Sequence, residues 1–375
     1  MLIMCGMKVL LIITHGSMGG AGIMVLDLAR GLKAQGVDVT VGFGKGEYLE
    51  RRLNELGIPR VRFASLARSR NIFSIPLFVL EIRKFLKKNR FDAVQFNSSN
   101  TLAGCFGAKL SGTGVRTVFT IHGLSVLDRH YASPFLKLPY WAYFKVFLPF
   151  ADEIVFVSQD NLREARLTGL TRRGRVIYNG MDPTALTYWT KEKARAELET
   201  ITGQSFANAY LIGSIGRLSY QKNYSFLIRT LPQILSIQPT IRCVLIGEGK
   251  KRALYERLIK KYRLESICFL AGGLEDAARL LKAFDLFVLP SRYEGLPITL
   301  VECLFADVPM LVTDVNGNKE IVEKENRYKM DDTKDFIQKF SGIVSRPQVT
   351  GYESLKSKFM FEKMTHAYTS LFKKP

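Results

Sequence analysis

The sequence is poor in cysteine, and its few cysteines are widely spread. Disulfide and zinc frameworks need cysteines at short, regular spacings. No close-spaced pair occurs, which disfavours both frameworks and predicts reduced thiols in the core of a cytoplasmic protein. The five cysteines, each in an apolar run, are Cys5, Cys105, Cys243, Cys268 and Cys303.

Long uninterrupted apolar segments are also missing. The opening run "MLIMCGMKVLLIITHG" is broken by Lys8 and leads into glycines without a small-residue cleavage pattern, so a first buried strand is expected rather than a signal peptide. The most apolar later stretch, residues 131–150, contains two lysines and three prolines. No membrane-spanning helix is therefore expected.

Acidic residues are scarce, with 34 against 54 lysines and arginines and a net charge of +20. Such an excess indicates an anionic partner: nucleic acid, an anionic membrane or a phosphorylated substrate. Between Arg60 and Arg90, nine basic residues and a single acid, Glu81, alternate with apolar side chains. This segment resembles a surface that lies on anionic lipid. A solvated helix face with an ordinary core stripe explains it equally well.

The length of 375 residues, with 47% apolar and 23% charged residues, suits two globular domains. Strands alternate with helices in the first half, which predicts a parallel sheet covered on both faces. Strands are expected at 9–14, 38–43, 61–63, 93–96, 116–121, 153–157 and 176–178, and helices near 21–35, 47–56, 73–89, 99–110, 134–149 and 159–167.

The same alternation restarts after a boundary near residue 185. The chain is thus predicted to be two doubly wound α/β domains, residues 1–185 and 186–351, with a ligand site in the cleft at the carboxyl ends of the strands. The second series has strands at 210–215, 242–246, 267–270, 286–289 and 310–313, and helices near 190–199, 222–235, 249–262, 275–282 and 297–305.

In each predicted domain, a glycine-rich turn follows the first strand. "THGSMGGAG" opens a helix in the first, and "GSIGRLSYQKN" carries Arg217 and Lys222 in the second. A helix N-terminus disfavours cations unless an anion joins them, so this pair suits a diphosphate. Neither turn has the spacing of a dinucleotide fingerprint or a P-loop.

Three further side chains fall at or near strand ends. His122 in "TIHG" follows a strand and could bind a polar ligand, although a satisfied structural histidine is the rival interpretation. In "SRYEGLPITLVEC", Glu294 lies in a loop after a strand, whereas Glu302 lies in an apolar helix. Because unpaired burial of a carboxylate is costly, a ligand with two hydroxyls would satisfy Glu302.

Together these motifs resemble the retaining glycosyltransferases of family four, which have the GT-B fold of two Rossmann-like domains facing across a cleft. The matching stretches run in family order from about Met7 to Val322. They are "GGAG", "TIHG", "VFVSQDN", "VIYNGMD", "GRLSYQKN" and "PSRYEGLPITLVEC".

The resemblance implies roles for the candidate residues. Arg217 and Lys222 would neutralise the donor's diphosphate, Glu302 would accept hydrogen bonds from both ribose hydroxyls, and Glu294 would face the donor sugar. His122 would lie near the 6-position of that sugar, as a further catalytic residue. The other donor-binding positions implied are Gly19, Gly20, Gly216, Gly247, Gly249, Gly272, Gly295 and Leu296. A C-terminal helix within 352–375 would return to the first domain.

No Asp-x-Asp occurs in the sequence, which predicts a metal-independent reaction without a cofactor. The expected reaction moves a hexose or N-acetylhexosamine from a nucleotide diphosphate sugar, with UDP favoured, to a lipid-linked glycan in capsule or lipopolysaccharide assembly. The enzyme would lie peripherally on the inner face of the cytoplasmic membrane, without a nucleic-acid partner. Aromatic residues between Phe135 and Phe147 support a membrane-bound acceptor, unless they are core packing.

Two alternatives remain. A sugar-nucleotide epimerase or hydrolase would share the fold but need no acceptor. A basic nucleic-acid or membrane-binding module would need no catalysis, but the stacking platforms and arginine-rich arms of nucleic-acid binders are missing. The segment "NGNKEIVEKENRY" departs from the family pattern, since Asn316 and Asn318 flank Gly317 where glycine and a small apolar residue are usual. This departure affects the contacts that the loop would make with the donor sugar.

Overall fold

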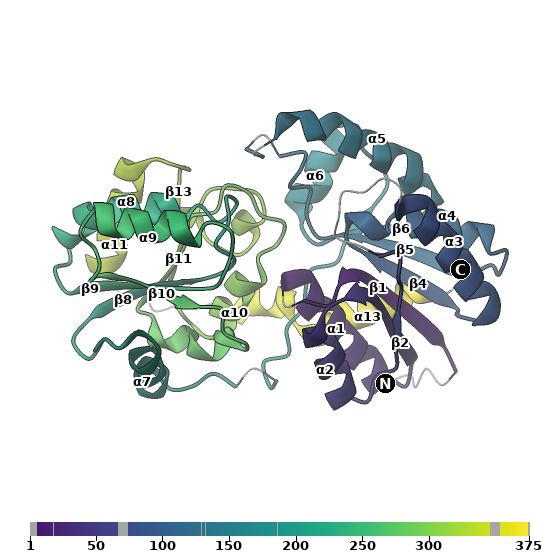
Figure 1. The fold of residues 1–375 in the computed structure, drawn as a ribbon, viewed down its shortest axis with the longest axis horizontal. Helices are drawn as coiled ribbons and strands as arrows, with labels where there is room; N and C mark the ends of the chain where they lie inside the picture. Colours follow the sequence, from purple (N-terminus) through teal and green to yellow (C-terminus); the bar gives the residue numbers. More distant parts are fainter. Residues whose placement is uncertain are drawn as a thin grey trace. The chain divides into compact units, whose positions relative to one another are not determined.

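The structure is a computed structural model that describes residues 6–17, 19–66, 74–128, 130–131, 133–185, 187–345 and 353–373. The chain divides into two compact units (Figure 1). The first comprises Met1–Leu127, Ser133–Asp182 and Lys358–Pro375, and the second Asp128–Ala132 and Pro183–Ser357. The main connections between the units are therefore Asp182–Pro183 and Ser357–Lys358, and the C-terminal segment belongs to the first unit.

The first unit is built on a seven-stranded parallel sheet of order β3-β2-β1-β4-β5-β6-β7. The central strands β1 and β4 are mostly apolar and almost entirely buried, as expected for a sheet covered on both faces. Its strands are β1 (Lys8–His15), β2 (Asp38–Lys45), β3 (Arg60–Arg62), β4 (Ala93–Asn97), β5 (Arg116–Ile121), β6 (Glu153–Phe156) and β7 (Arg175–Val176).

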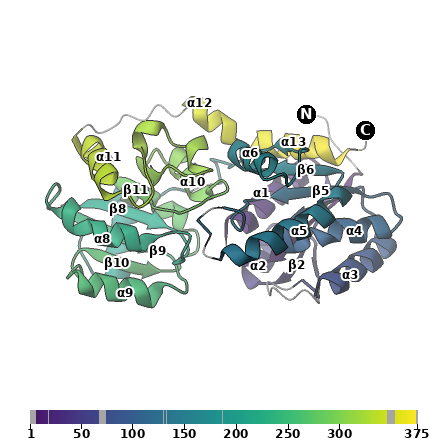
Figure 2. The same cartoon turned by 90° about the horizontal axis from the view of Figure 1, so that it is seen from above.

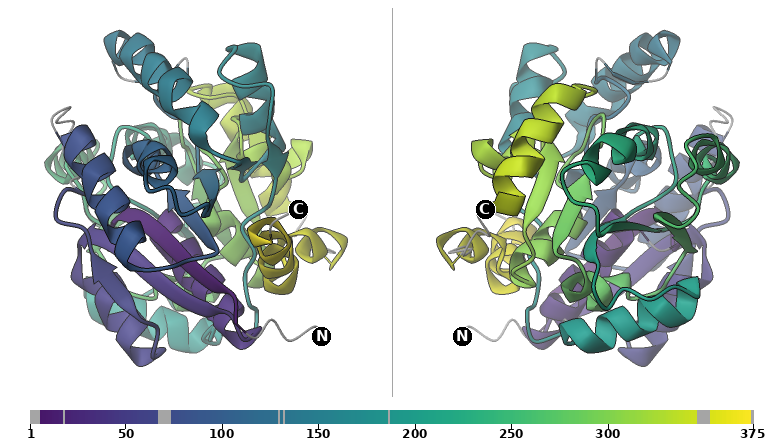
Figure 3. Two further views of the ribbon diagram at one scale, coloured as in Figure 1. Left: turned by 90° about the vertical axis from the view of Figure 1, so that its right-hand side faces the viewer. Right: turned by 90° about the vertical axis from the view of Figure 1, so that its left-hand side faces the viewer.

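Helices cover both faces of this sheet. Parallel strands need crossovers, which are right-handed, so reversal of the strand order at β1 places helices on opposite faces. One face carries α3 (Ser74–Lys88), α4 (Ala103–Leu110), α5 (Lys137–Phe147) and α6 (Gln159–Leu167), with short 3₁₀ turns at Ser99–Thr101, Pro134–Leu136 and Leu148–Phe150. The other carries α1 (Gly20–Ala34), α2 (Glu47–Glu55) and α13 (Phe361–Phe372), which packs on α1 and β5 (Figure 3, left).

The second unit is a six-stranded parallel sheet of order β10-β9-β8-β11-β12-β13. Helices α8, α9 and α11 lie on one face, and α7 and α10 on the other (Figures 1 and 2). The strands are β8 (Tyr210–Ile215), β9 (Ile241–Ile246), β10 (Cys268–Gly272), β11 (Leu286–Leu289), β12 (Met310–Thr313) and β13 (Arg327–Tyr328). The helices are α7 (Lys191–Thr202), α8 (Tyr224–Leu235), α9 (Arg252–Lys261), α10 (Ile298–Phe305), α11 (Thr333–Ser345) and α12 (Glu353–Lys356), with 3₁₀ turns at Ala277–Ala283, Asn318–Glu320, Lys324–Asn326 and Ser357–Phe359.

Local sequence explains where several helices begin and end. The Ser158 hydroxyl accepts from the Asn161 amide at the start of α6, and the Thr190 hydroxyl accepts from the Lys193 amide at the start of α7. Such side-chain caps satisfy amides that have no partner within the helix. Gly203 ends α7 in the left-handed region, with φ 68°, where glycine is favoured.

Some sequence-based expectations for these elements were wrong. The helix expected near 275–282 is a 3₁₀ turn at Ala277–Ala283, and the one near 99–110 is a 3₁₀ turn followed by the shorter α4. The C-terminal stretch is not one helix, because Met181 pairs with Met360 as an isolated bridge and interrupts it. Helix α11 and the short β13 were not predicted, since their sequence is charged and lacks a long apolar run.

Burial agrees with the expectation for the cysteines. Cys105, Cys243, Cys268 and Cys303 are free and buried, whereas Cys5 lies outside the described residues. Among the described residues no helix combines the length and apolarity needed to cross a bilayer.

Candidate functional site

The second unit brings most of the predicted site residues to the carboxyl edge of its sheet. Strands β8 and β11 are neighbours there, but the chain leaves them toward opposite sides of the sheet. Such a switch point is where ligands bind in doubly wound sheets, because the two diverging loops leave a crevice. Arg217 and Lys222 follow β8, and Glu294 follows β11.

Lys222 and Glu294 form an ion pair across this switch point. The Lys222 Nζ lies 2.7 Å from the Glu294 Oε1, with side-chain exposures of 14% and 7%. The Ser291 hydroxyl also donates to Oε1, at 2.7 Å, and the Gln221 amide donates to Oε2, at 3.2 Å. Three donors therefore fix the carboxylate in one orientation, and Ser291 and Gln221 are site residues that the sequence reading missed.

Further hydrogen bonds join the loops after β8 and β11. The Arg292 amide donates to the Gln221 carbonyl at 2.8 Å, and the Gln221 side chain donates to the Tyr293 carbonyl at 3.0 Å. The Arg292 guanidinium donates to Asn223 Oδ1 at 2.9 Å and pairs with Asp331 at 2.7 Å. These contacts hold Lys222 and Glu294 on a cross-linked backbone. In the sequence, these contacts were signalled only by the basic and amide side chains within "GRLSYQKN" and "PSRYEGLPITLVEC".

Two of the predicted glycines, Gly247 and Gly249, lie where backbone segments approach closely. The Gly247 amide donates to the Gly272 carbonyl at 2.7 Å, and a Cβ added to Gly247 would lie 2.1 Å from the Gly216 carbonyl oxygen. Gly249 stands in the same relation to Leu218, at 2.4 Å. The ends of β8, β9 and β10 therefore pack main chain against main chain. This close packing requires glycine at these positions whether or not a phosphate binds.

Helix α10 carries Glu302, the second glutamate of "SRYEGLPITLVEC". Gly295 and Leu296 precede its first turn, so amide groups of this segment lie at a helix N-terminus. Glu302 is 7% exposed, as its apolar helix predicted, and its backbone carbonyl accepts from the Tyr188 hydroxyl at 2.8 Å. Thr299 in the first turn has a buried hydroxyl with no hydrogen-bond partner among the described residues.

Arg217 differs from Lys222 in its surroundings. It is exposed, one residue after Gly216 and five residues before Lys222 in the same loop. The two cations therefore come from one loop but have different burial, with Lys222 held against Glu294. Two cations in one loop, one exposed and one paired with a carboxylate, can bind an anion of two linked phosphates.

The first unit holds the remaining candidates at the carboxyl edge of its own sheet. Gly19 precedes α1 and Gly20 is its first residue, and a Cβ added to Gly19 would meet nothing within 4 Å. The turn is therefore open on that side. His122 follows β5, and its Nε2 lies 3.1 Å from the Oδ1 of Asn97, the last residue of β4.

This contact identifies the tautomer of His122. The Asn97 side-chain nitrogen donates to the Ile12 carbonyl at 3.3 Å, so its oxygen faces the ring and must accept. His122 Nε2 therefore carries the proton and Nδ1 is an acceptor. Burial lowers the pKa of His122 to about 4, so the ring is neutral at pH 7. The structure is therefore compatible with both interpretations of His122. Its Nε2 is hydrogen-bonded to Asn97, as for a structural histidine, and its Nδ1 can still accept a hydrogen bond from a ligand.

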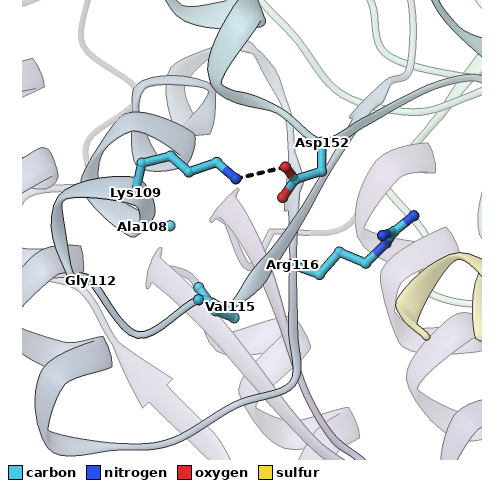
Figure 4. A pocket seen from close by; sticks show the side chains of 7 residues that line it. Ala108, Lys109, Gly112, Val115, Arg116 and Asp152 are labelled. Atoms are coloured by element: carbon cyan, nitrogen blue, oxygen red, sulfur yellow. Dashed lines mark hydrogen bonds and ion pairs between the residues drawn. The ribbon is translucent and has the colours of Figure 1, made fainter. Parts of the chain in front are cut away.

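A cavity of about 580 Å³ lies elsewhere in the first unit (Figure 4). Lys109, Arg116 and Asp152 line it, at the amino ends of β5 and β6. Lys109 pairs with Asp152 at 2.6 Å, and Arg116 pairs with Glu153 at 2.9 Å. Ligands of doubly wound sheets bind at the opposite, carboxyl edge, and these cations already have anionic partners. We therefore do not assign this cavity to the functional site.

Each unit has the Rossmann-like fold from which GT-B glycosyltransferases are built. Residues 18–185 match the family described as Glycosyltransferase Family 4, and residues 200–345 match Glycosyl transferases group 1. The chain therefore belongs to the family-four, group 1 glycosyltransferases. The resemblance drawn from its motifs is confirmed.

Curated relatives with similar sequences are glycosyltransferases. The UDP-Gal:alpha-D-GlcNAc-diphosphoundecaprenol alpha-1,3-galactosyltransferase of Escherichia coli is 27% identical over 74% of this chain and 71% of its own length. A Campylobacter jejuni alpha-1,4-N-acetyl-D-galactosaminyltransferase that acts on a diphosphoundecaprenol-linked glycan is 24% identical, over 84% and 82%. An uncharacterized glycosyltransferase of Methanocaldococcus jannaschii is 28% identical, and this chain spans only 44% of its length.

Solved structures share the fold. HepE of Anabaena, in complex with UDP and glucose, superposes with a TM-score of 0.81 at 20% identity over 97% of this chain and 98% of its own. Sucrose-phosphate synthase of Thermosynechococcus elongatus gives 0.80 at 19% identity, over 98% of each chain. The predicted fold class is thereby confirmed.

Proposed function

We propose that this protein is a retaining, metal-independent glycosyltransferase. It transfers a hexose or N-acetylhexosamine from a nucleotide diphosphate sugar, with UDP as the favoured nucleotide, to a lipid-linked glycan during cell-surface polysaccharide synthesis. It works at the inner face of the cytoplasmic membrane as a peripheral protein, and needs no cofactor.

The observation that carries this proposal is the Lys222–Glu294 pair at the β8/β11 switch point. A diphosphate brings two negative charges, whereas Arg217, Lys222 and Glu294 together have a net charge of +1. Lys222 is already held in place, so little side-chain freedom is lost when phosphate approaches. Arg217 is exposed in the same loop and adds a second positive charge. This pair of cations supplies the charge that a bridging metal supplies elsewhere, which agrees with the lack of Asp-x-Asp.

The remaining assignments follow the resemblance. Glu302 accepts from both ribose hydroxyls, Glu294 contacts the donor sugar, and His122 contacts its 6-position. Amides of Gly295 and Leu296 bind phosphate at the N-terminus of α10, with Gly216, Gly247 and Gly249 flanking the diphosphate and Gly272 near the base. Gly19 and Gly20 contact phosphate or acceptor.

In the proposed reaction the bond between the anomeric carbon and the diphosphate oxygen breaks, and the electron pair leaves with the phosphate. The acceptor oxygen forms the new bond on the same face of the sugar, and its proton passes to the departing phosphate oxygen. Fixed cations stabilise the developing negative charge, which is the main electrostatic need of this step.

Two findings support the choice of substrates. HepE, which shares the fold, has been solved with UDP and with UDP-glucose. Relatives named in the previous section act on diphosphoundecaprenol-linked glycans. An undecaprenol chain confines an acceptor to the membrane, so an enzyme without a membrane-spanning helix among its described residues would have to reach the bilayer surface.

The experiment that tests this proposal measures the melting temperature of the protein with UDP, GDP, ADP or CMP and with their sugar derivatives. Selective stabilisation by UDP would support the donor site, since a ligand that binds only the native state raises its stability. Equal indifference to every nucleotide would contradict the proposal. Product analysis then separates transfer from epimerisation or hydrolysis, and activity retained in EDTA tests metal independence.

A further inference from the structure

Exposed large hydrophobic side chains gather on one face of the first unit. Nine such side chains occur among the described residues, and seven belong to the layer α3–α6 or to the turn that opens α5. None is on α1, α2 or α13, which cover the opposite face. The seven are Leu77, Leu80, Leu110, Phe135, Leu138, Val146 and Leu167.

The same layer is positively charged. Helices α3–α6 carry nine lysines and arginines and three acids, whereas α1, α2 and α13 carry five of each. Helix α5 has no acid at all. Exposed large apolar side chains and a net positive charge therefore coincide on one face, whereas the helices of the other face have neither.

Helix α5 presents the most continuous apolar stripe. Leu138, Ala142 and Val146 recur every fourth residue and so share one side of the helix, and all three are exposed. Phe135 precedes them and is 88% exposed. The aromatic residues on the other side, by contrast, pack against the core, as the alternative interpretation of that segment held.

Polar contacts anchor α5 and join it to the end of α6. On the inner side, the Tyr143 hydroxyl donates to the Ser99 carbonyl at 3.1 Å. Toward α6, the Trp141 indole donates to the Thr168 carbonyl at 3.1 Å, and Lys145 donates to the Gly169 carbonyl at 2.9 Å. Leu167, the last residue of α6, is 80% exposed beside these contacts. The stripe is thus part of a fixed surface rather than a loose helix.

The basic segment read from the sequence contributes only in part. Arg60 and Arg62 both pair with Glu50, and Arg68 and Arg70 lie outside the described residues. Five exposed cations remain: four on the second half of α3, where Lys87 and Lys88 form its last turn, and Arg90 just after it.

We infer that the α3–α6 face of the first unit docks on an anionic lipid bilayer, with the α5 stripe inserted at the level of the headgroups. A helix with an apolar side and cationic flanks binds such a surface, because the apolar side leaves water while the cations meet lipid phosphates. Nucleic acid would match the charge but offers no medium for Phe135, Leu138 and Val146. This inference rests on the proposed function, whose lipid-linked acceptor lies in the same bilayer.

Flotation of the full-length protein with vesicles tests the docking face. We expect it to float with phosphatidylcholine vesicles that contain phosphatidylglycerol, and much less with pure phosphatidylcholine. Leu138→Glu should reduce anionic-vesicle binding about tenfold, because a carboxylate enters the headgroup layer. Ile237→Glu, at an exposed apolar residue of the second unit, is the matched control and should bind as the wild type does.

A second pair of variants tests the charge. Lys87→Glu with Lys88→Glu should weaken binding, whereas Lys260→Glu with Lys261→Glu, the equivalent last turn of α9, should not. Unchanged flotation of Leu138→Glu would overturn the insertion of α5, and absence of wild-type flotation would overturn the docking face altogether.

Nucleotide response separates this inference from the proposed function. Each variant should keep the thermal stabilisation that UDP gives the wild type, which also shows that it is folded. Stabilisation by UDP without vesicle binding would overturn only the docking face. Vesicle binding without any nucleotide response would overturn only the transferase.

Discussion

The Lys222 Nζ lies 2.7 Å from the Glu294 Oε1 and so joins the loop after β8 to the loop after β11. Neither residue is near the other in sequence, and the two strands become neighbours only because the sheet order reverses at this point. The pair therefore depends on the fold, and in turn it orders two loops that the proposed donor would contact.

Lys222→Ala should weaken UDP binding roughly 10- to 100-fold, because a charge-assisted hydrogen bond contributes about 1.5–3 kcal/mol. Isothermal calorimetry with UDP measures the loss. Lys334→Ala, at an exposed lysine on α11 of the same unit, is the control and should bind as the wild type does.

The same substitution leaves the Glu294 carboxylate with only Ser291 and Gln221 as donors. We expect Lys222→Ala to unfold at a lower temperature, and Glu294→Gln combined with it to recover part of the loss without restoring UDP affinity. Recovery of affinity in the double variant would show that Lys222 acts on the loop structure rather than on phosphate.

Glu302→Gln should weaken UDP binding by about tenfold or more, because an amide oxygen is a poorer acceptor for two hydroxyls than a carboxylate. The diagnostic comparison uses 2′,3′-dideoxy-UDP. Wild-type protein should prefer UDP, whereas the variant should bind both nucleotides with similar affinity. A variant that keeps the full preference would refute the ribose contact.

The sequence predicted most of the architecture because the buried parallel strands are mostly apolar and are separated by amphipathic helices. It predicted the place of Lys222 and Glu294 at strand ends, but not their contact, since strand order cannot be read from apolar runs. Ser291, Gln221 and Arg292 were missed for the same reason: each acts on a loop that is distant in sequence. Helix α11 was missed because its apolar residues are interrupted by charge.

His122 should stay neutral over the physiological pH range. Burial lowers its pKa to about 4 from 6.5, so the folded state resists protonation. Between these values the unfolded chain binds more protons, and the contribution of His122 to stability is lost as pH falls from 6.5 toward 4. NMR of the four histidines, with His122→Asn to assign the signal, should show no protonation of this ring above pH 5. Titration near 6.5 would contradict the desolvation of this ring.

The contribution of Asp27, on α1, to stability should change with pH in the opposite direction to that of His122. Burial raises its pKa to about 7 from 3.8, and Asp182 adds to the rise, although Arg30 opposes it at 3.4 Å. Between pH 3.8 and 7 the folded state binds more protons than the unfolded chain, so the contribution of Asp27 to stability falls as pH rises. Asp27→Asn removes this titration and should be more stable than the wild type at pH 8, by up to about 4 kcal/mol.

Denaturation of both proteins from pH 4 to pH 8 measures this difference. Subtracting the wild-type free energy of unfolding from that of Asp27→Asn cancels the contribution of His122, which both proteins share. The difference should grow with pH and level off above 7. Asp38→Asn, at an exposed aspartate, is the control and should give a small, nearly constant offset. If the difference in the free energy of unfolding were also constant for Asp27→Asn, the contact with Arg30 would be enough to keep the Asp27 carboxyl ionised at its ordinary pKa. Arg30 also pairs with Asp182, the residue just before the connection to the second unit.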